Sequence, residues 1–192
     1  MLTLGMRRLL FCVIGLPGSG KSTVADYIAH RYRGTVIHSG DVIRAEVRRR
    51  KLPYTSESDL KVAQWFHEEG RQKLLAKRVW EVLKHSKKSI LVEEGFRSLE
   101  ATRELQRLAG RRCIIIATVC PFKVRAARLA KRKRFAAGES LSYLRQRDRD
   151  ELRRGVGAVM KVADYRISNN GTQKQTEMHV DKLMKRLLAR RE

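Results

Sequence analysis

The chain has 192 residues, a length typical of one globular domain. A hydrophobic content of 42% is enough for a core and excludes a disordered chain, while 13 Gly and three Pro exclude a collagen-like one. Forty-three basic and 20 acidic side chains give a formal charge of +23, which favours polyanionic or multiply phosphorylated partners. A surface that is merely rich in charge, with 33% charged residues, is the alternative.

The predicted strands are short apolar runs at residues 8–14, 35–39, 89–94, 112–120 and 165–168. Helical patterns separate them, at about 23–32, 41–51, 56–83, 98–109, 122–135, 141–153, 156–162 and from 174 onward. The pattern at 56–83 reads as one long helical region capped by Ser56 or Ser58, and the last helix as amphipathic, with Met178, Leu183, Leu187 and Leu188 on its apolar side. This alternation predicts an α/β fold, with a parallel sheet covered on both faces and ligands at the carboxyl ends of the strands.

Three cysteines, Cys12, Cys113 and Cys120, lie in or beside apolar runs and form no CxxC pair. We expect buried, reduced thiols in a cytoplasmic protein. No apolar run approaches the roughly 18–20 residues that span a membrane, so we expect no membrane partner.

The strongest motif is GLPGSGKS at residues 15–22, which matches GxxxxGK[ST] and lies between a strand and a helix. Successive backbone N–H groups there form an anion site at a helix N-terminus. Lys21 can reach the β- and γ-phosphates, and the Ser22 hydroxyl can bind Mg²⁺. We therefore predict that a nucleoside triphosphate binds at Gly15, Pro17, Gly18, Ser19, Gly20, Lys21, Ser22 and Thr23.

A second group, Asp41 and Arg44, follows the second predicted strand and opens a helix. A carboxylate and an arginine there could activate and anchor a phosphoryl acceptor. The alternative is a helix cap beside a solvated arginine.

A third group, EEGFR at residues 93–97, ends the third predicted strand. A carboxylate at this place can hold Mg²⁺ through water, and Arg97 can face a phosphate. Alternation puts Glu93 and Glu94 on opposite sides of the strand. We favour Glu94 for the metal, with Glu93 left open.

A basic segment at residues 123–155 follows the fourth predicted strand. Phosphoryl transfer needs water excluded and charge on the phosphoryl oxygens stabilised, and an arginine-bearing lid does both. We assign a catalytic phosphate contact to Arg128. Helical surface ion pairs, such as Asp150 with Arg154, are the alternative for any single arginine.

These motifs together resemble the P-loop nucleoside monophosphate kinase group. GDVIRAEV at residues 40–47 looks like the adenylate kinase segment that binds the acceptor phosphate, and EGFR at 94–97 is similar to the Asp-Gly-Phe-Pro-Arg element, with Glu for Asp and no Pro. ADYRISNNGT at 163–172 looks like the part of dephospho-coenzyme A kinases near the adenine of ATP. The whole chain most resembles archaeal adenylate-kinase-related proteins without a settled substrate.

The resemblance implies a single P-loop kinase domain over residues 1–192 and a five-stranded parallel sheet in the order 2-3-1-4-5. It also implies a helical acceptor insert near 52–85, a lid near 123–155, ATP and Mg²⁺ as cofactors, and Asn170 in the ATP site. The acceptor, a nucleotide or nucleotide-like metabolite that carries phosphate, is not specified. Tyr54, Trp65, Phe66 and Arg71 could clamp it, although we expect Trp65 and Phe66 to pack in the core.

Two functions fit these observations. The first is an ATP-dependent kinase in which Lys21, Asp41, Arg44, Arg97 and Arg128 act on phosphates and Ser22 and Glu94 hold Mg²⁺. The second is an ATPase associated with RNA or the ribosome, which the charge of +23 supports, with the basic lid as the RNA surface. The chain lacks an Asn-Lys-x-Asp guanine motif, so a GTPase switch fits poorly. The sequence does not predict an oligomeric state.

Overall fold

A computed structural model describes residues 8–68, 70–131 and 141–189. Five parallel strands form one sheet in the order β2-β3-β1-β4-β5, as the resemblance implied. The strands are β1 (Leu9–Ile14), β2 (Thr35–His38), β3 (Ile90–Glu94), β4 (Cys113–Val119) and β5 (Tyr165–Ser168). Among the described residues, no helix is both long and apolar enough to cross a membrane.

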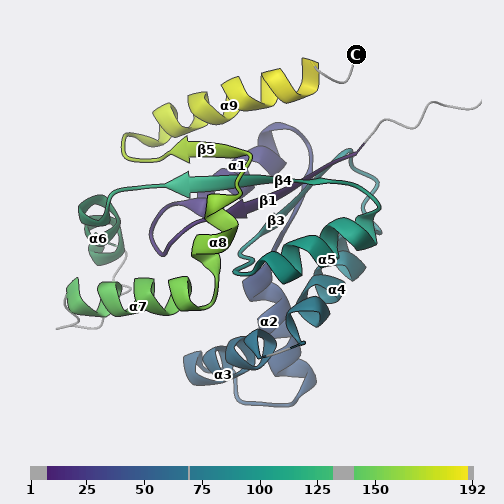
Figure 1. Ribbon diagram of the computed structural model, residues 1–192, viewed down its shortest axis with the longest axis vertical. Coiled ribbons are helices and arrows are strands. Elements are labelled where there is room, and N and C mark those ends of the chain that lie inside the picture. The colour runs from purple at the N-terminus through teal and green to yellow at the C-terminus, as the bar shows by residue number, and fades with distance from the viewer. Residues whose placement is uncertain (1–7, 69, 132–140, 190–192) are drawn as a thin grey trace, which may run out of the picture.

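Helices cover both faces of the sheet, with α9 on one side and α4 and α5 on the other (Figure 1). Their bounds are α1 (Lys21–Arg31), α2 (Ser39–Arg49), α3 (Ser56–His67), α4 (Gln72–Leu83), α5 (Leu99–Ala109), α6 (Phe122–Lys131), α7 (Leu141–Arg153), α8 (Val156–Lys161) and α9 (Gln173–Ala189). The predicted extension of α6 to Phe135 and the break at Gly138 lie outside the described residues.

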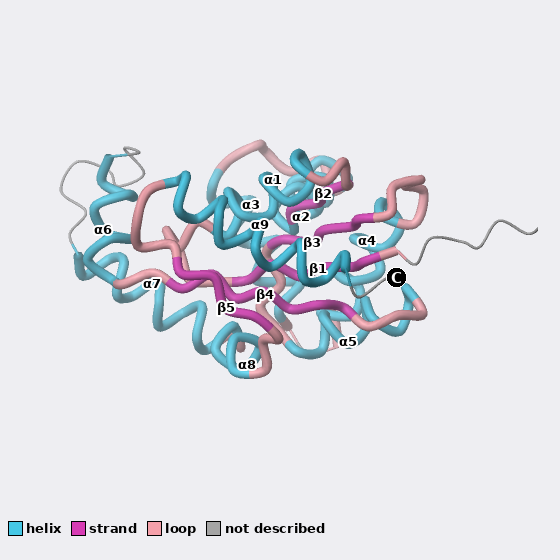
Figure 2. Tube along the Cα trace, turned by 90° about the horizontal axis from the view of Figure 1, so that it is seen from above, coloured by secondary structure: helices cyan, strands magenta, loops and turns pink. Residues whose placement is uncertain are grey.

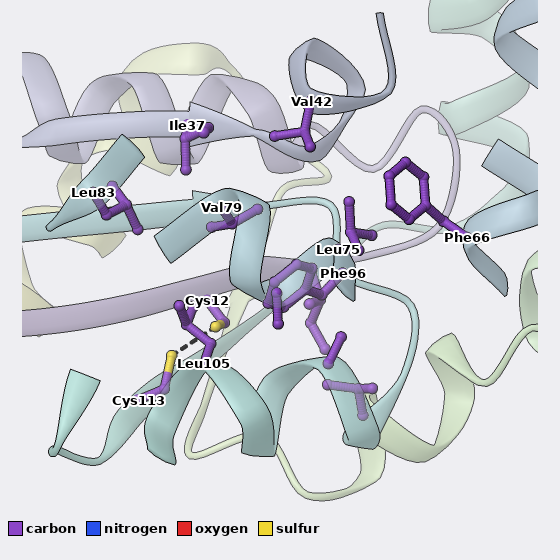
Figure 3. Packing of buried hydrophobic residues seen from close by; sticks show 14 of the residues in the cluster. Cys12, Ile37, Val42, Phe66, Leu75, Val79, Leu83, Phe96, Leu105 and Cys113 are labelled. Carbon is purple, nitrogen blue, oxygen red and sulfur yellow. Dashed lines mark hydrogen bonds between the residues drawn. The ribbon is translucent and has the colours of Figure 1, made fainter. Parts of the chain in front are cut away.

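The buried residues of the sheet form two apolar clusters, one on each face. The cluster toward α2–α5 and α8 contains Phe66, Phe96 and Leu105, and the cluster toward α1 and α9 contains Phe11 and Met184. Since β1 and β3 have neighbours on both sides and helices on both faces, their sequences are almost continuously apolar. Cys12 and Cys113 meet in the first cluster as buried free thiols (Figure 3), whereas Cys120, also expected to be buried, is half-buried.

The helical region predicted as one helix over 56–83 is two helices, so that prediction was wrong. α3 ends at His67, α4 begins at Gln72, and Gly70 between them has a φ of +75°, a left-handed conformation that ends helices. The cap is also different, because the Thr55 hydroxyl accepts from the Ser58 N–H at 3.2 Å. A hydrophobic pattern of helical period does not show where a helix is interrupted.

The apolar side of the last helix differs from the prediction at Met178, and Leu188 is only half-buried. Met178 is 61% exposed, while Val180, Leu183, Met184 and Leu187 are buried against the sheet and α1. Phe66 is buried as expected, and Trp65 is half-buried beneath Arg50, whose guanidinium lies 3.8 Å from the ring centroid.

Candidate functional site

The phosphate-binding loop connects β1 to α1 at the carboxyl edge of the sheet. Gly20 precedes α1 with a φ of +85°, and a side chain there would collide with the Asn169 amide. Glycine is therefore required both by the backbone conformation and by the close approach of Asn169. The free N–H groups of the first turn of α1 face the place where the motif binds phosphate.

Three other elements hold this loop in position. The Ser19 hydroxyl lies 2.8 Å from Oγ1 of Thr118 on β4, and the Asn169 side-chain amide donates to the Ser19 carbonyl at 2.8 Å. Arg125 of α6 donates to the Pro17 carbonyl at 2.9 Å and is 4% exposed. The loop is thus fixed before any ligand arrives, which reduces the cost of ordering it on binding.

Of the two adjacent asparagines after β5, Asn169 contacts this loop, and the expected role of Asn170 in the ATP site stays a prediction. Asn169 is buried and contacts the loop, whereas Asn170 is exposed and bonds the Ser168 hydroxyl. Arg128 donates to the Asn169 carbonyl at 2.8 Å and to the Gly171 carbonyl at 3.2 Å. Arg128 therefore braces the turn after β5 and does not line the cavity beside Lys21.

The two consecutive glutamates point to opposite faces of the sheet. Glu94 is in register with Val13 and His38 and faces α1, where its Oε1 lies 3.7 Å from the Lys21 ammonium. Glu93 is fully buried on the other face, and its Oε1 accepts from the Ser39 hydroxyl at 2.8 Å and the Phe96 N–H at 3.0 Å. Burial raises the pKa of Glu93 to about 8. Glu93 thus holds the turn at the end of β3, and Glu94 faces the loop.

His38 at the end of β2 was not expected in the site. Its Nδ1 lies 2.9 Å from Glu94 Oε2 and its Nε2 lies 3.0 Å from an Asp26 oxygen on α1. The hydrogen bond with Glu94 raises the pKa of His38 to about 9. Burial opposes ionisation of Glu94, but His38 and Lys21 outweigh it, so the pKa of Glu94 is lowered. The position of His38 at the carboxyl end of a predicted strand is the feature of the sequence that could have placed it in the site.

A cavity of about 470 Å³ opens beside Lys21 and Glu94. It is bounded by residues of α1, α2, α3 and α7 and by the turn after β3. Its charged lining residues are Lys21, His38, Arg44, Asp59, Glu94, Arg97, Arg147, Glu151 and Arg154. This volume is in the range of small-molecule sites, and the charges suit an anionic ligand.

Arg97 and Arg154 share the buried carboxylate of Glu151, which belongs to α7. This carboxylate holds the two cations at the cavity wall and links the turn after β3 to α7. His67 at the end of α3 lies in the field of both arginines. Burial and these charges lower the pKa of His67 to about 4, and neither ring nitrogen has a hydrogen-bond partner among the described residues.

Asp41 is not the helix cap, because α2 begins at Ser39 with His38 before it. Its side chain pairs with Arg44 at 2.5 Å and lines a separate groove beside β2. Arg44 lines the cavity next to Lys21, so only the arginine of the pair reaches it.

A phosphate-binding loop after the central strand of a 2-3-1-4-5 parallel sheet defines the P-loop kinase fold. A family model described as an AAA domain matches residues 14–145. The UPF0200 protein of Aeropyrum pernix is 39% identical over 171 residues, covering 88% of this chain and 89% of that protein. The UPF0200 protein of Pyrococcus horikoshii is 36% identical over 187 residues, covering 94% and 98%. The chain belongs to the UPF0200 family.

Solved structures share the fold at low sequence identity. A shikimate kinase from Acinetobacter baumannii in complex with shikimate superposes with a TM-score of 0.58, at 18% identity and 96% coverage of both chains. A gluconokinase from Sinorhizobium meliloti gives 0.57 at 17% identity, covering 96% of this chain and 99% of its own. These similarities establish the architecture and leave the acceptor open.

Proposed function

We propose that this protein transfers the γ-phosphoryl group of ATP to a small, phosphate-bearing acceptor, a nucleotide or nucleotide-like metabolite. One observation carries the proposal. Besides Lys21, four arginine side chains from three separate parts of the chain line the cavity: Arg44, Arg97, Arg147 and Arg154. Cations converging beside a P-loop suit two phosphorylated reactants better than hydrolysis of one.

Positioning and charge neutralisation would account for most of the catalysis. Lys21 would bind the β- and γ-phosphates, and Arg44 and Arg97 would anchor the acceptor anion next to the γ-phosphate. Because the transferred phosphoryl group passes through a loose transition state, aligned reactants and fixed cations lower the barrier. Asp41 would orient Arg44, and Arg128 would act on the nucleotide side by bracing the turn at residues 169–171, with Asn170 at its exposed surface.

The residues present fit a Mg²⁺ ion at the phosphates. Glu94 Oε1 is buried without a hydrogen-bond partner among the described residues, and Ser22 lies in the same cavity wall. Carboxylate and hydroxyl oxygens are ligands that Mg²⁺ accepts. The ion would neutralise phosphate charge, and His38 would keep the Glu94 carboxylate aimed at it.

The test is ADP release with Mg²⁺·ATP alone and with a panel of nucleoside monophosphates, dephospho-coenzyme A and short RNA. The proposal expects one small acceptor to stimulate release strongly. Arg97→Ala should raise the KM of that acceptor at least about tenfold. The exposed Arg78→Ala variant on α4, which lies outside the cavity, should leave this KM unchanged. Slow release that no small acceptor changes would contradict the proposal.

A further inference from the structure

A second concentration of positive charge lies at the amino edge of the sheet, opposite the cavity. The connections that lead into β2, β3, β1 and β4 meet there, at the end of the sheet remote from α6 and α7 (Figure 2). We define the basic edge as Arg8, Arg31, Arg33, Lys84, Lys87, Lys88, Arg111 and Arg112. The nearby carboxylates are Glu81, which pairs with Lys84, and Asp164, which pairs with Arg112.

Side-chain hydrogen bonds join these connections into one surface. Arg8 donates to the Ser86 carbonyl at 2.5 Å, and Arg111 donates to the Arg8 carbonyl at 2.9 Å. The Thr35 and Ser86 hydroxyls lie 2.6 Å apart. Two half-buried arginines therefore fix the loops, and the other cations of the edge project from them into solvent.

Four exposed cations of the basic edge, Arg31, Arg33, Lys87 and Lys88, make no ion pair within residues 8–68, 70–131 and 141–189. Arg31 lies at the C-terminus of α1, where a cation is favourable against the helix dipole without any partner. Arg33, Lys87 and Lys88 lie beyond the helix ends, so this reason does not apply to them. Because no described carboxylate pairs with these three side chains, a bound polyanion would supply their counter-charge.

We propose that the basic edge binds the phosphate backbone of double-helical nucleic acid. Four neighbouring strands about 4.8 Å apart span about 14 Å. A duplex carries one phosphate charge per roughly 1.7 Å of its axis, or about eight charges over this length. A surface meets one side of the duplex and so faces about half of these charges, a number that the four unpaired cations of the basic edge match.

The aromatic side chains favour a duplex over an unpaired strand. Proteins that bind single strands stack bases on aromatic rings. Among the described residues, the exposed aromatic side chains are Tyr54 before α3 and Tyr143 on α7, outside the basic edge. A surface of cations without stacking rings reads backbone charge and shape, as proteins that bind double-stranded RNA do.

The test uses a triple variant, Arg33→Asn, Lys87→Gln and Lys88→Gln, in the full chain. Fluorescence anisotropy would follow binding to labelled RNA and DNA duplexes of equal length, without ATP, over a range of salt concentrations. If each side chain meets one phosphate, the slope of log K against log salt becomes shallower by about three. Affinity at 0.1 M salt should then fall more than about tenfold.

The matched control removes the same charge elsewhere, as Lys73→Gln, Lys77→Gln and Lys182→Gln on α4 and α9, all exposed. This control variant should bind the duplexes with an affinity within about twofold of that of the unmodified protein. Both triple variants should have the melting temperature and the rate of ADP release of the unmodified protein. Equal loss in the two variants, no duplex binding at low salt, or tighter binding to an unpaired strand would each overturn the proposal. Since binding is measured without ATP, its failure would leave the proposed kinase activity untouched.

Discussion

The cations at the two edges of the sheet differ in their partners. At the carboxyl edge, Lys21 faces Glu94, Arg97 pairs with Glu151, and Arg125 pairs with Asp148. At the amino edge, Arg33 and Lys87 extend into solvent and make no ion pair within the described residues. Buried pairs hold a side chain in one geometry, which positions a reactant, whereas exposed unpaired cations attract anions without fixing them.

The largest expected effect is on stability at the carboxyl edge. Arg125 is 4% exposed and bonds both oxygens of Asp148, at 2.8 and 2.6 Å, as well as the Pro17 carbonyl. Arg125→Ala leaves the Asp148 carboxylate, whose side chain is only 14% exposed, without its partner and should lower the free energy of unfolding by about 3–5 kcal/mol. Urea denaturation measures this. Adding Asp148→Asn should recover part of the loss, and a cost under 1 kcal/mol for Arg125→Ala would refute the buried pair.

Next is the loss of the loop lysine. Lys21→Ala should lower acceptor-dependent turnover about 10²–10³-fold because it removes a fixed cation from the transferred phosphoryl group. Steady-state ADP release measures it, and the melting temperature should change little because Lys21 is not a core residue. Lys87→Ala at the amino edge is the control and should turn over normally. Comparable turnover in Lys21→Ala and the unmodified protein would remove the P-loop from the mechanism.

A smaller effect concerns pH. The pKa of His67 is lowered from 6.5 to about 4 by burial and by the Arg97 and Arg154 charges. The unfolded chain therefore binds more protons than the folded one between pH 4 and 6.5, and stability should rise with pH in this window, by up to about 3 kcal/mol. His67→Leu should remove this contribution and flatten the unfolding free energy between pH 4 and 6.5. An unchanged slope in the variant would show that His67 titrates normally.

The smallest expected effect is on the stability contributed by an exposed ion pair at the amino edge. Lys84 pairs with Glu81 at 2.6 Å, but both side chains are exposed. Lys84→Ala should lower the free energy of unfolding by less than about 1 kcal/mol, against the larger loss for Arg125→Ala. Parallel urea titrations compare the two, and equal costs would show that burial does not separate the two edges.

Local patterns predicted the elements and the loop well. Every strand was predicted within two residues of its bounds. Continuous apolar runs mark β1, β3 and β4, which are buried on both faces, whereas the edge strands β2 and β5 are short and mixed in character. The motif at residues 15–22 was predicted securely because it lies between a predicted strand and a predicted helix, as a phosphate-binding loop requires. The resemblance then gave the strand order, which is confirmed.

Contacts between segments that are distant in the chain could not be predicted from the sequence. Asn169 reaches Ser19 across 150 residues, and Glu151 meets Arg97 across 54. No local spacing distinguishes Asn169 from Asn170, since the turn geometry alone decides which one is buried. His38 was missed because one histidine has no motif until β3 places Glu94 beside it.

The most direct test of the central claim is transfer of the labelled γ-phosphate of ATP to the acceptor that stimulates ADP release. It should be run on the unmodified protein, Arg97→Ala and the basic-edge triple variant. The account predicts stoichiometric label in the acceptor, a loss of at least about tenfold in Arg97→Ala at limiting acceptor, and normal transfer in the triple variant. Label released only as inorganic phosphate, or transfer lost in the triple variant, would contradict the division between the two edges.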